Sequence, residues 1–393
     1  MAHEVVKAGY WFSASGRPVT QINSALFTHL YAGFAMVNRV PLRDNEHKVV
    51  TFPLHYEKIF QDFPNTVRRR NPAVKALLSI GSIGGEGHNI SEAIAYAVSD
   101  PERRTRFINE SIQLARDFQY DGLDLCWLYP SHTDHQGQLR DLLIEWRSAL
   151  DEDVERTNRP MLLLTAAVFH HPIIPARTVD NNAAEFRYPI AALANLDRIN
   201  ILAIDFFTPS NSPEKTGPVH AWNTDRSGSP SGLDGIERWT ENGAIPTNKF
   251  LLGLPFYGYQ WTLKYNNENV FFARASPANT RSLEFRNIQA NFIRANDAGT
   301  LVENNSYAAP YWYSDATWIG FENENSISTK IRSAVTKKNL GGYFAWHVTA
   351  DDENDTLSNA GMGLSSVKAC IGNNHQQHDL QYYSDMVCLL YYI

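Results

Sequence analysis

The stretch YDGLDLCWLYP, residues 120–130, is an apolar run that ends in a turn at a proline. Residues 122–128 are almost continuously apolar, which is typical of a parallel strand buried on both faces. Successive side chains on a strand point to opposite faces, so Asp124, Cys126 and Leu128 share one side. The strand therefore presents a wall that combines a carboxylate, a thiol and a branched alkyl group.

Seven other β-rich apolar runs resemble this one, and helical patterns separate several of them. The runs cover residues 5–12, 29–35, 74–81, 162–168, 199–205, 250–257 and 341–347. Before one helical pattern, Ser99 and Glu102 have the spacing of a capping box, with Pro101 inside the first turn. Eight strands that alternate with helices predict an α/β protein with a (β/α)8 TIM barrel.

One interval breaks this alternation, between the seventh apolar run and the last helical pattern. Residues 262–317 are too many for a loop, so they predict a small inserted domain. The barrel then comprises residues 5–261 and 318–362. The composition changes after Gly363, and residues 363–393 form a tail to which we assign no fold.

The bulk composition argues against several classes of protein. The 393 residues carry a net charge of -7 without a Lys/Arg-rich run, so we expect no nucleic-acid partner. No run of about 18 apolar residues occurs, so we expect no membrane span. Cys126, Cys370 and Cys388 are too few for a disulfide framework. His170 and His171 lack companions at metal-ligand spacing, so we predict no metal and no cofactor.

Several stretches together resemble glycoside hydrolase family 18, and in particular the plant class V chitinases. Besides residues 120–130 they are VVKAGYWF, LFTHLYAGFA, VKALLSIG, LLLTAAVF, LLGLPFYGYQWTL, TWIGFENENSI and GGYFAWHVTADD. The resemblance extends from about Val5 to Leu357. It implies the same barrel, an α+β character for the insertion after the seventh strand, and a secreted or vacuolar plant protein active in defence. The first residues contain no signal-peptide pattern, so a cytoplasmic location stays open.

The resemblance also shows where this chain departs from the family. The family's fourth strand reads DGxDxDWEYP, and its glutamic acid protonates the glycosidic oxygen while the substrate's own N-acetyl oxygen attacks. The corresponding residues here are Asp124, Cys126 and Leu128, so a leucine replaces the acid. The family's sixth strand reads M-A-Y-D, and here Ile204 replaces its tyrosine before Asp205. Because general acid catalysis contributes about 10²–10⁴-fold, these departures predict that hydrolysis is lost.

The aromatic residues that hold a sugar in the family are retained. Trp346, at the end of the eighth strand, matches the tryptophan beneath the central sugar. A sugar face stacks on an indole without an acid, so binding and catalysis are separable. The predicted carbohydrate-binding residues are Trp346, Tyr10, Phe34, Tyr257, Asp205 and Asp124.

We therefore predict a catalytically silent, lectin-like barrel that binds chitin oligomers or N-glycans. One alternative is residual chitinase activity, or another reaction in the same cleft, which would use Asp124, Asp205 or Cys126. The other is a protein-binding barrel of the inhibitor type. These residues also have interpretations without a functional role. Asp124 and Asp205 can be buried carboxylates held by hydrogen bonds, and Cys126 can be a small buried hydrophobic residue.

Overall fold

The computed structural model describes most of the chain. The described residues are 4–82, 87–128, 130, 133–174, 186–226, 228–241, 243–295 and 299–361. The tail at 363–393, with Cys370 and Cys388, lies outside them.

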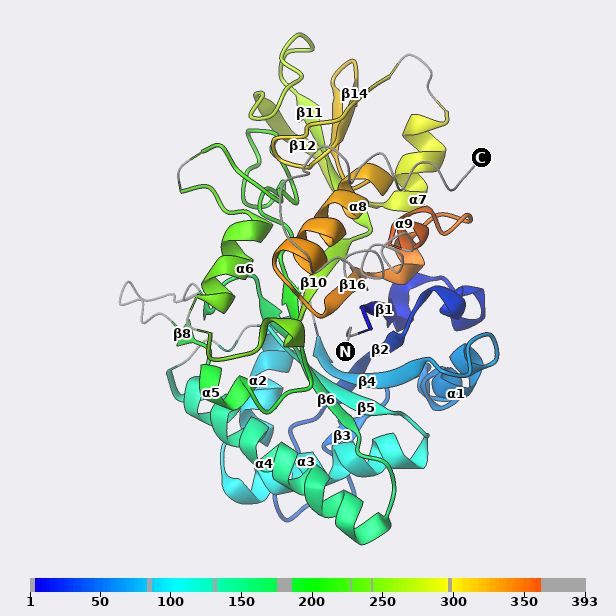
Figure 1. Cartoon of the computed structure of the whole chain (residues 1–393), viewed down its shortest axis with the longest axis vertical. Helices are drawn as coiled ribbons and strands as arrows, with labels where there is room; N and C mark the ends of the chain where they lie inside the picture. Colours follow the sequence, from blue (N-terminus) through cyan, green and yellow to red (C-terminus); the bar gives the residue numbers. More distant parts are fainter. Residues whose placement is uncertain are drawn as a thin grey trace, which may run out of the picture.

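Eight of the described strands run parallel and close into a barrel, which confirms the predicted (β/α)8 fold (Figure 1). They are β1 (Val6–Phe12), β2 (His29–Val37), β4 (Lys75–Ser82), β5 (Gly122–Trp127), β6 (Leu163–Phe169), β9 (Arg198–Leu202), β10 (Phe250–Pro255) and β16 (Gly342–Trp346). Strand β1 pairs with β2 on one side and with β16 on the other, and this pairing closes the sheet. A short strand, β3 (Val50–Thr51), pairs antiparallel with β2.

Helices surround the strands and cover their outward side chains. They are α1 (Glu57–Arg68), α2 (Gly87–Ala97), α3 (Pro101–Asp117), α4 (Thr133–Thr157), α5 (Ile190–Leu193), α6 (Gly232–Thr240), α8 (Glu324–Arg332) and α9 (Thr356–Ala360). Short 3₁₀ turns lie at 13–15, 19–21, 24–26, 247–249 and 348–350. One π-helical turn, 289–293, extends α7 (Phe285–Ile288), and another, 333–337, extends α8. The outward core includes Trp11, Leu123, Leu125 and Trp146, all 2% exposed or less.

Helix α3 begins one residue later than its predicted cap. Asp100, not Ser99, is the N-cap, and its carboxylate accepts hydrogen bonds from the backbone N–H groups of Glu102 at 3.1 Å and Arg103 at 3.0 Å. The prediction of a cap at Ser99 is wrong because the Ser99 hydroxyl instead donates to the carbonyl of Tyr96 at 2.9 Å. Either residue type can cap a helix, so the sequence pattern alone did not separate them.

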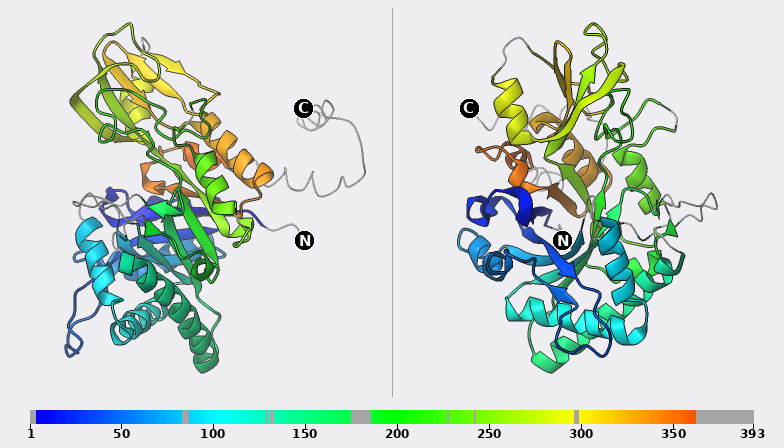
Figure 2. Two further views of the ribbon diagram at one scale, coloured as in Figure 1. Left: turned by 90° about the vertical axis from the view of Figure 1, so that its left-hand side faces the viewer. Right: turned by 180° about the vertical axis from the view of Figure 1, so that it is seen from behind.

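A second, antiparallel sheet follows the seventh barrel strand. Its order is β12 (Ala275–Glu284), β11 (Tyr257–Leu263), β15 (Thr317–Gly320), β14 (Tyr311–Ser314) and β13 (Thr300–Val302), and α7 (Phe285–Ile288) follows β12. Trp261 and Trp318 pack edge to face in its own small core, with ring centroids 5.5 Å apart. This sheet lies at the end of the molecule farthest from α3 and α4 in each view (Figure 2). Because β11 starts two residues after β10 ends, the sheet rises from the carboxyl end of the barrel.

Candidate functional site

A polar layer crosses the interior of the barrel around Asp124. One carboxylate oxygen of Asp124 accepts hydrogen bonds from the hydroxyls of Tyr10 at 2.9 Å and Ser79 at 2.6 Å. The other oxygen accepts from Thr165 Oγ1 at 2.6 Å and from Asn200 Nδ2 at 3.5 Å. The donors come from four different strands, so the barrel's closure itself assembles the layer.

Asp124 is fully buried, and its environment holds it in place. Burial raises the pKa of the Asp124 carboxyl, and the hydrogen bonds from Ser79, Thr165 and Tyr10 offset part of that rise. A ligand could contact this carboxylate only if some of its donors gave up their bonds. The structure therefore places Asp124 beneath the predicted binding surface, in a supporting position.

The next layer toward the carboxyl end is apolar where the resemblance implies reactive groups. Cys126 and Leu128 are 1% and 6% exposed, and Ile204 packs against the same inner cluster. Burial and the neighbouring Asp124 raise the pKa of the Cys126 thiol well above its usual value, so the thiol stays protonated and unreactive. None of these three side chains can donate a proton to a leaving group at neutral pH.

Aromatic side chains complete this layer. Trp346 lies edge-on to Tyr10, with centroids 4.7 Å apart, and to Phe12 at 5.0 Å. Phe12 stacks on Phe34 at 5.1 Å, and both phenylalanines are half-buried. Trp346 is only 4% exposed, so its neighbours leave only a small part of the side chain open to solvent. The predicted aromatic residues on β1, β2 and β16 are thus brought together in one cluster.

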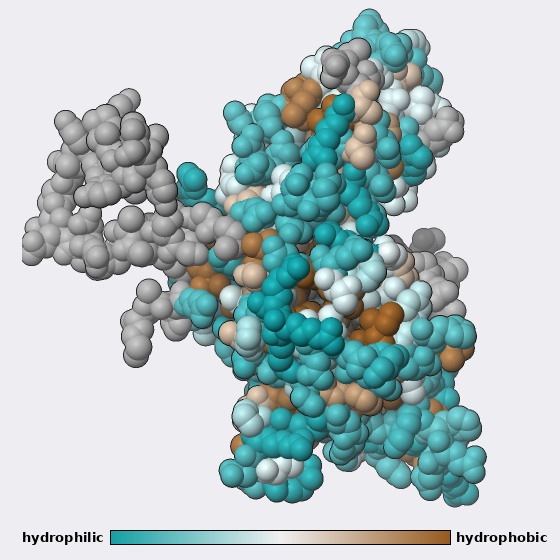
Figure 3. All heavy atoms as spheres, turned by 90° about the vertical axis from the view of Figure 1, so that its right-hand side faces the viewer, coloured by the Kyte–Doolittle hydropathy of each residue, from teal (hydrophilic) through white to brown (hydrophobic). Residues whose placement is uncertain are grey.

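Asp205 and Tyr257 form the polar edge of this region. The Tyr257 hydroxyl donates to both carboxylate oxygens of Asp205, at 2.9 Å each, and the Asp205 side chain is 35% exposed. Burial raises the pKa of Asp205 to about 6, and the hydrogen bond from Tyr257 lowers it in part. We call Cys126, Leu128, Ile204, Asp205, Phe12, Phe34, Tyr257 and Trp346 the barrel mouth. In Figure 3 the surface is indented between the part with the second sheet and the barrel.

Sequence reasoning missed three residues that the structure brings to the site. Asn200 donates to the Tyr10 hydroxyl at 2.7 Å as well as to Asp124. Phe12 lies two residues after Tyr10 on β1, and the same strand alternation that grouped Asp124 with Leu128 could have found it. His220 accepts a hydrogen bond at Nδ1 from the backbone N–H of Asp205 at 3.1 Å, and no sequence pattern marks it.

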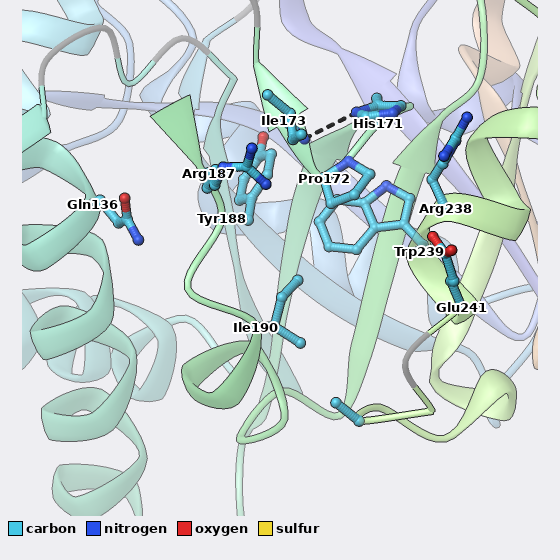
Figure 4. A pocket seen from close by; sticks show the side chains of 11 residues that line it. Gln136, His171, Pro172, Ile173, Arg187, Tyr188, Ile190, Arg238, Trp239 and Glu241 are labelled. Carbon is cyan, nitrogen blue, oxygen red and sulfur yellow. Dashed lines mark hydrogen bonds between the residues drawn. The ribbon is translucent and has the colours of Figure 1, made fainter. Parts of the chain in front are cut away.

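A second cavity of about 440 Å³ lies outside the barrel, beside the segment after β6. Side chains from α4, from the strands β7 (Ile173–Ile174) and β8 (Phe186–Arg187), and from α6 surround it (Figure 4). His171 lines it and accepts a hydrogen bond from the backbone N–H of Ile173 at 3.1 Å. Its other polar side chains include Gln136, Arg187, Arg238 and Glu241.

Within the described ranges, no group of three or more His, Cys, Asp or Glu side chains is placed to hold a metal ion. No helix in the same part of the chain is both long and apolar enough to cross a membrane.

Comparisons with known proteins agree with the geometry. Residues 6–351 match the family profile of the glycosyl hydrolases family 18. A class V chitinase of Arabidopsis thaliana is 41% identical over 366 residues, which cover 92% of this chain and 89% of that protein. A mutant class V chitinase from Nicotiana tobaccum, solved in complex with NAG4, is 35% identical with a TM-score of 0.82, covering 92% and 98% of the two chains. A chitinase-like agglutinin from Robinia pseudoacacia is 34% identical with a TM-score of 0.78, covering 91% and 98%.

Proposed function

This chain belongs to the glycosyl hydrolases of family 18, and we propose that it binds carbohydrate at the barrel mouth without hydrolysing it. Leu128 carries the proposal. The resemblance implies that Leu128 stands in the position of the family's catalytic glutamic acid, and a leucine offers no proton to a glycosidic oxygen. Cys126 stays protonated, and Ile204 cannot donate a hydrogen bond to a reacting acetamide. The groups needed in the transition state are missing together, while the binding surface persists.

The aromatic cluster supports retained binding. Trp346, Phe12 and Phe34 present ring faces and edges within one 5–6.4 Å network, and such surfaces bind the apolar faces of sugar rings. The tobacco relative was solved with NAG4, which favours chitin oligomers as ligands, and the chitinase-like agglutinin favours a lectin-like role. Chitin oligomers and N-glycan fragments are therefore the ligands to test first.

One observation favours a second candidate, residual hydrolysis. Asp205 is partly exposed, its pKa is raised to about 6, and so a fraction of its carboxyl groups is protonated in mildly acidic solution. A carboxyl group with this pKa can act as a general acid. Against this, its two oxygens already accept the Tyr257 hydroxyl, and the polar partner before it in the family is replaced by Ile204.

A paired assay tests the proposal. Purified protein is titrated calorimetrically with chitin oligomers and N-glycan fragments, and the same oligomers are incubated with it and examined for new reducing ends. We expect measurable binding and no cleavage above the buffer control. Cleavage at a rate typical of chitinases contradicts the proposal. Cleavage that appears only in mildly acidic solution and disappears in Asp205→Asn supports the second candidate.

A further inference from the structure

Among the described residues, Asp205 forms no ion pair with a lysine or an arginine. It follows β9 with a backbone φ of 62°, a left-handed conformation that aspartate tolerates better than most residues. Its side chain accepts hydrogen bonds from the hydroxyl of Tyr257, at 2.9 Å to each oxygen, and from the side chain of Tyr259, whose ring lies 5.8 Å from that of Tyr257 on the same strand. The amide of Asn211 reaches the Asp205 backbone carbonyl at 3.5 Å. All three of these neighbours are uncharged at neutral pH.

His220 does not supply the missing positive charge. Its Nδ1 accepts the Asp205 backbone N–H at 3.1 Å, so this nitrogen carries a lone pair and not a proton, although it lies 3.7 Å from a carboxylate oxygen. Burial, and then the positive charge of Lys330, lower the pKa of His220 well below its usual value. The lowered pKa favours the neutral imidazole at neutral pH, where Asp205 is ionised.

Lys330 is itself committed to other partners. Its ammonium group forms a buried ion pair with Glu322 and donates to the backbone carbonyl of His220 at 2.5 Å. Ser326 donates to the second oxygen of Glu322 at 2.5 Å, which completes the pair's hydrogen bonding. Lys330 thus contacts the backbone of His220, and Glu322 neutralises its charge. Within the described residues, no lysine or arginine forms an ion pair with Asp205.

The surroundings of Asp205 suit a cation better than a neutral amide. Ile204 and Tyr257 pack against the inner cluster that holds Leu128 and Trp346, so aromatic rings and alkyl groups border the carboxylate. Aromatic faces attract cations, and a carboxylate bordered by apolar groups attracts them more strongly than one in open water. Leu128 and Ile204 offer no hydrogen bond to an acetamide. The main polar group of the barrel mouth is therefore a negatively charged hydrogen-bond acceptor, the Asp205 carboxylate.

We propose that the barrel mouth selects a sugar with a free ammonium group, as in the glucosamine units of partly deacetylated chitin, and pairs that group with Asp205. This inference rests on the proposed function, because it names which carbohydrate the same site prefers. The ammonium supplies the charge that Asp205 lacks, and the aromatic cluster holds the ring. A fully acetylated oligomer has no group that complements the carboxylate as well.

The pairing predicts a pH dependence with a definite sign. Asp205 must be ionised to hold the ammonium, and its pKa is raised to about 6, so affinity for glucosamine oligomers falls as the pH drops from about 7 to about 5. Burial raises the pKa of Tyr257 well above its usual value, so Tyr257 keeps its proton throughout this range, and burial lowers the pKa of His220 well below its usual value. Affinity for N-acetylated oligomers, which carry no charge, changes little over the same range.

Calorimetric titration with glucosamine tetramer and N-acetylglucosamine tetramer, at about pH 7 and about pH 5, tests the inference. Wild-type protein is compared with Asp205→Asn, which keeps an acceptor for the Tyr257 hydroxyl. Glu241→Gln, an exposed carboxylate at the second cavity, is the matched control. We expect wild type and Glu241→Gln to bind the glucosamine tetramer about tenfold more tightly at neutral pH, and Asp205→Asn to lose that preference.

The outcomes separate the two proposals. Equal or tighter binding of the acetylated tetramer by wild type overturns the inference and leaves the proposed function standing. Binding of neither tetramer, nor of N-glycan fragments, overturns both. Unchanged affinity of folded Asp205→Asn for the glucosamine tetramer overturns the role of Asp205. If Asp205→Asn does not fold, the wild-type pH dependence decides, since a flat profile for the glucosamine tetramer contradicts the pairing.

Discussion

The two carboxylates of the barrel interior, Asp124 and Asp205, lie in opposite environments. Asp124 is fully buried and accepts hydrogen bonds from four side chains, whereas Asp205 is 35% exposed and accepts hydrogen bonds from the side chains of Tyr257 and Tyr259. Burial raises the pKa of both groups. A raised pKa therefore does not by itself identify a functional acid. Access to ligand and unused hydrogen-bonding capacity distinguish the two residues.

The two layers that contain these carboxylates differ in the same way. The polar layer around Asp124 is satisfied and intact, and it supports the barrel. The barrel mouth keeps its aromatic rings but holds Leu128 and Ile204 where the resemblance implies reactive polar groups. If this division is correct, changes in the mouth should alter chemistry and binding, and changes in the polar layer should alter stability.

The largest expected effect is a gain of hydrolysis when several mouth residues are changed together. Leu128→Glu supplies a proton donor, but Ile204 cannot orient an acetamide, so we expect little cleavage of chitin oligomers by this single variant. The triple variant Leu128→Glu, Cys126→Asp, Ile204→Tyr should exceed it by about 100-fold or more, because groups that act as a unit are not additive. Reducing-end release from chitin oligomers measures both.

The triple variant with Leu128→Gln in place of Leu128→Glu is the matched control, and it should remain inactive because an amide has no acidic proton. Normal chitinase activity in the Leu128→Glu single variant would contradict the importance given to Ile204. It would also show that the intact polar layer suffices to support catalysis.

The next effect in size is a loss of stability when the polar layer is broken. Asp124→Ala leaves the hydroxyls of Tyr10, Ser79 and Thr165 without their acceptor in a buried site. We expect the free energy of unfolding to fall by about 3–5 kcal/mol. Asp141→Ala removes a partly exposed carboxylate on α4 that pairs only with the neighbouring Arg140 at 2.8 Å, and it should change the free energy of unfolding by less than about 0.5 kcal/mol. Chemical denaturation measures both, and a small effect at Asp124 would mean that the layer does not hold the barrel together.

Loss of sugar affinity in Trp346→Ala should be smaller in free energy. Removing one aromatic platform costs about 1–3 kcal/mol by analogy with stacking on other flat ligands, or about tenfold or more in affinity. Trp239→Ala is a matched control, since both tryptophans are 4% exposed and Trp239 lies outside the barrel interior. Both variants should lose stability, but only Trp346→Ala should lose affinity in calorimetric titrations. Unchanged affinity in folded Trp346→Ala would place the sugar site elsewhere.

The sequence predicted the fold because the relevant signals are local. Continuous apolar runs and helical spacing come from neighbouring residues, and they led to the barrel that the structure shows. The strand alternation around Asp124 likewise placed Cys126 and Leu128 on its side of β5. The cap of α3 was missed because Ser99 and Asp100 are both suitable, and only the structure shows which one bonds the helix.

The site's polar partners could not be predicted for a different reason. Asn200 lies 190 residues from Tyr10 along the chain and 76 from Asp124, yet it donates hydrogen bonds to both. His220 comes from an irregular segment and reaches Asp205 through a backbone N–H. Such contacts arise when the barrel closes, and no periodic pattern records them. For the same reason, the sequence could not predict whether a positively charged side chain lies next to Asp205.

The smallest expected effect returns to Asp205, as a gain of stability in Asp205→Asn. A carboxyl whose pKa is raised on folding is more stable folded when protonated, so its contribution is favourable below about pH 4 and is lost as the pH rises through about 6. Near pH 7 the ionised group therefore costs stability, by about 1 kcal/mol once its solvent exposure is taken into account. Asparagine removes that cost, so thermal or denaturant unfolding should show a more stable variant at neutral pH and no gain below about pH 4. An Asp205→Asn variant that is less stable at neutral pH would mean that a positive charge compensates the carboxylate in the folded protein. If Asp205→Asn is more stable and also loses glucosamine binding, then the negative charge of Asp205 lowers the stability of the folded protein and is needed to bind the ligand.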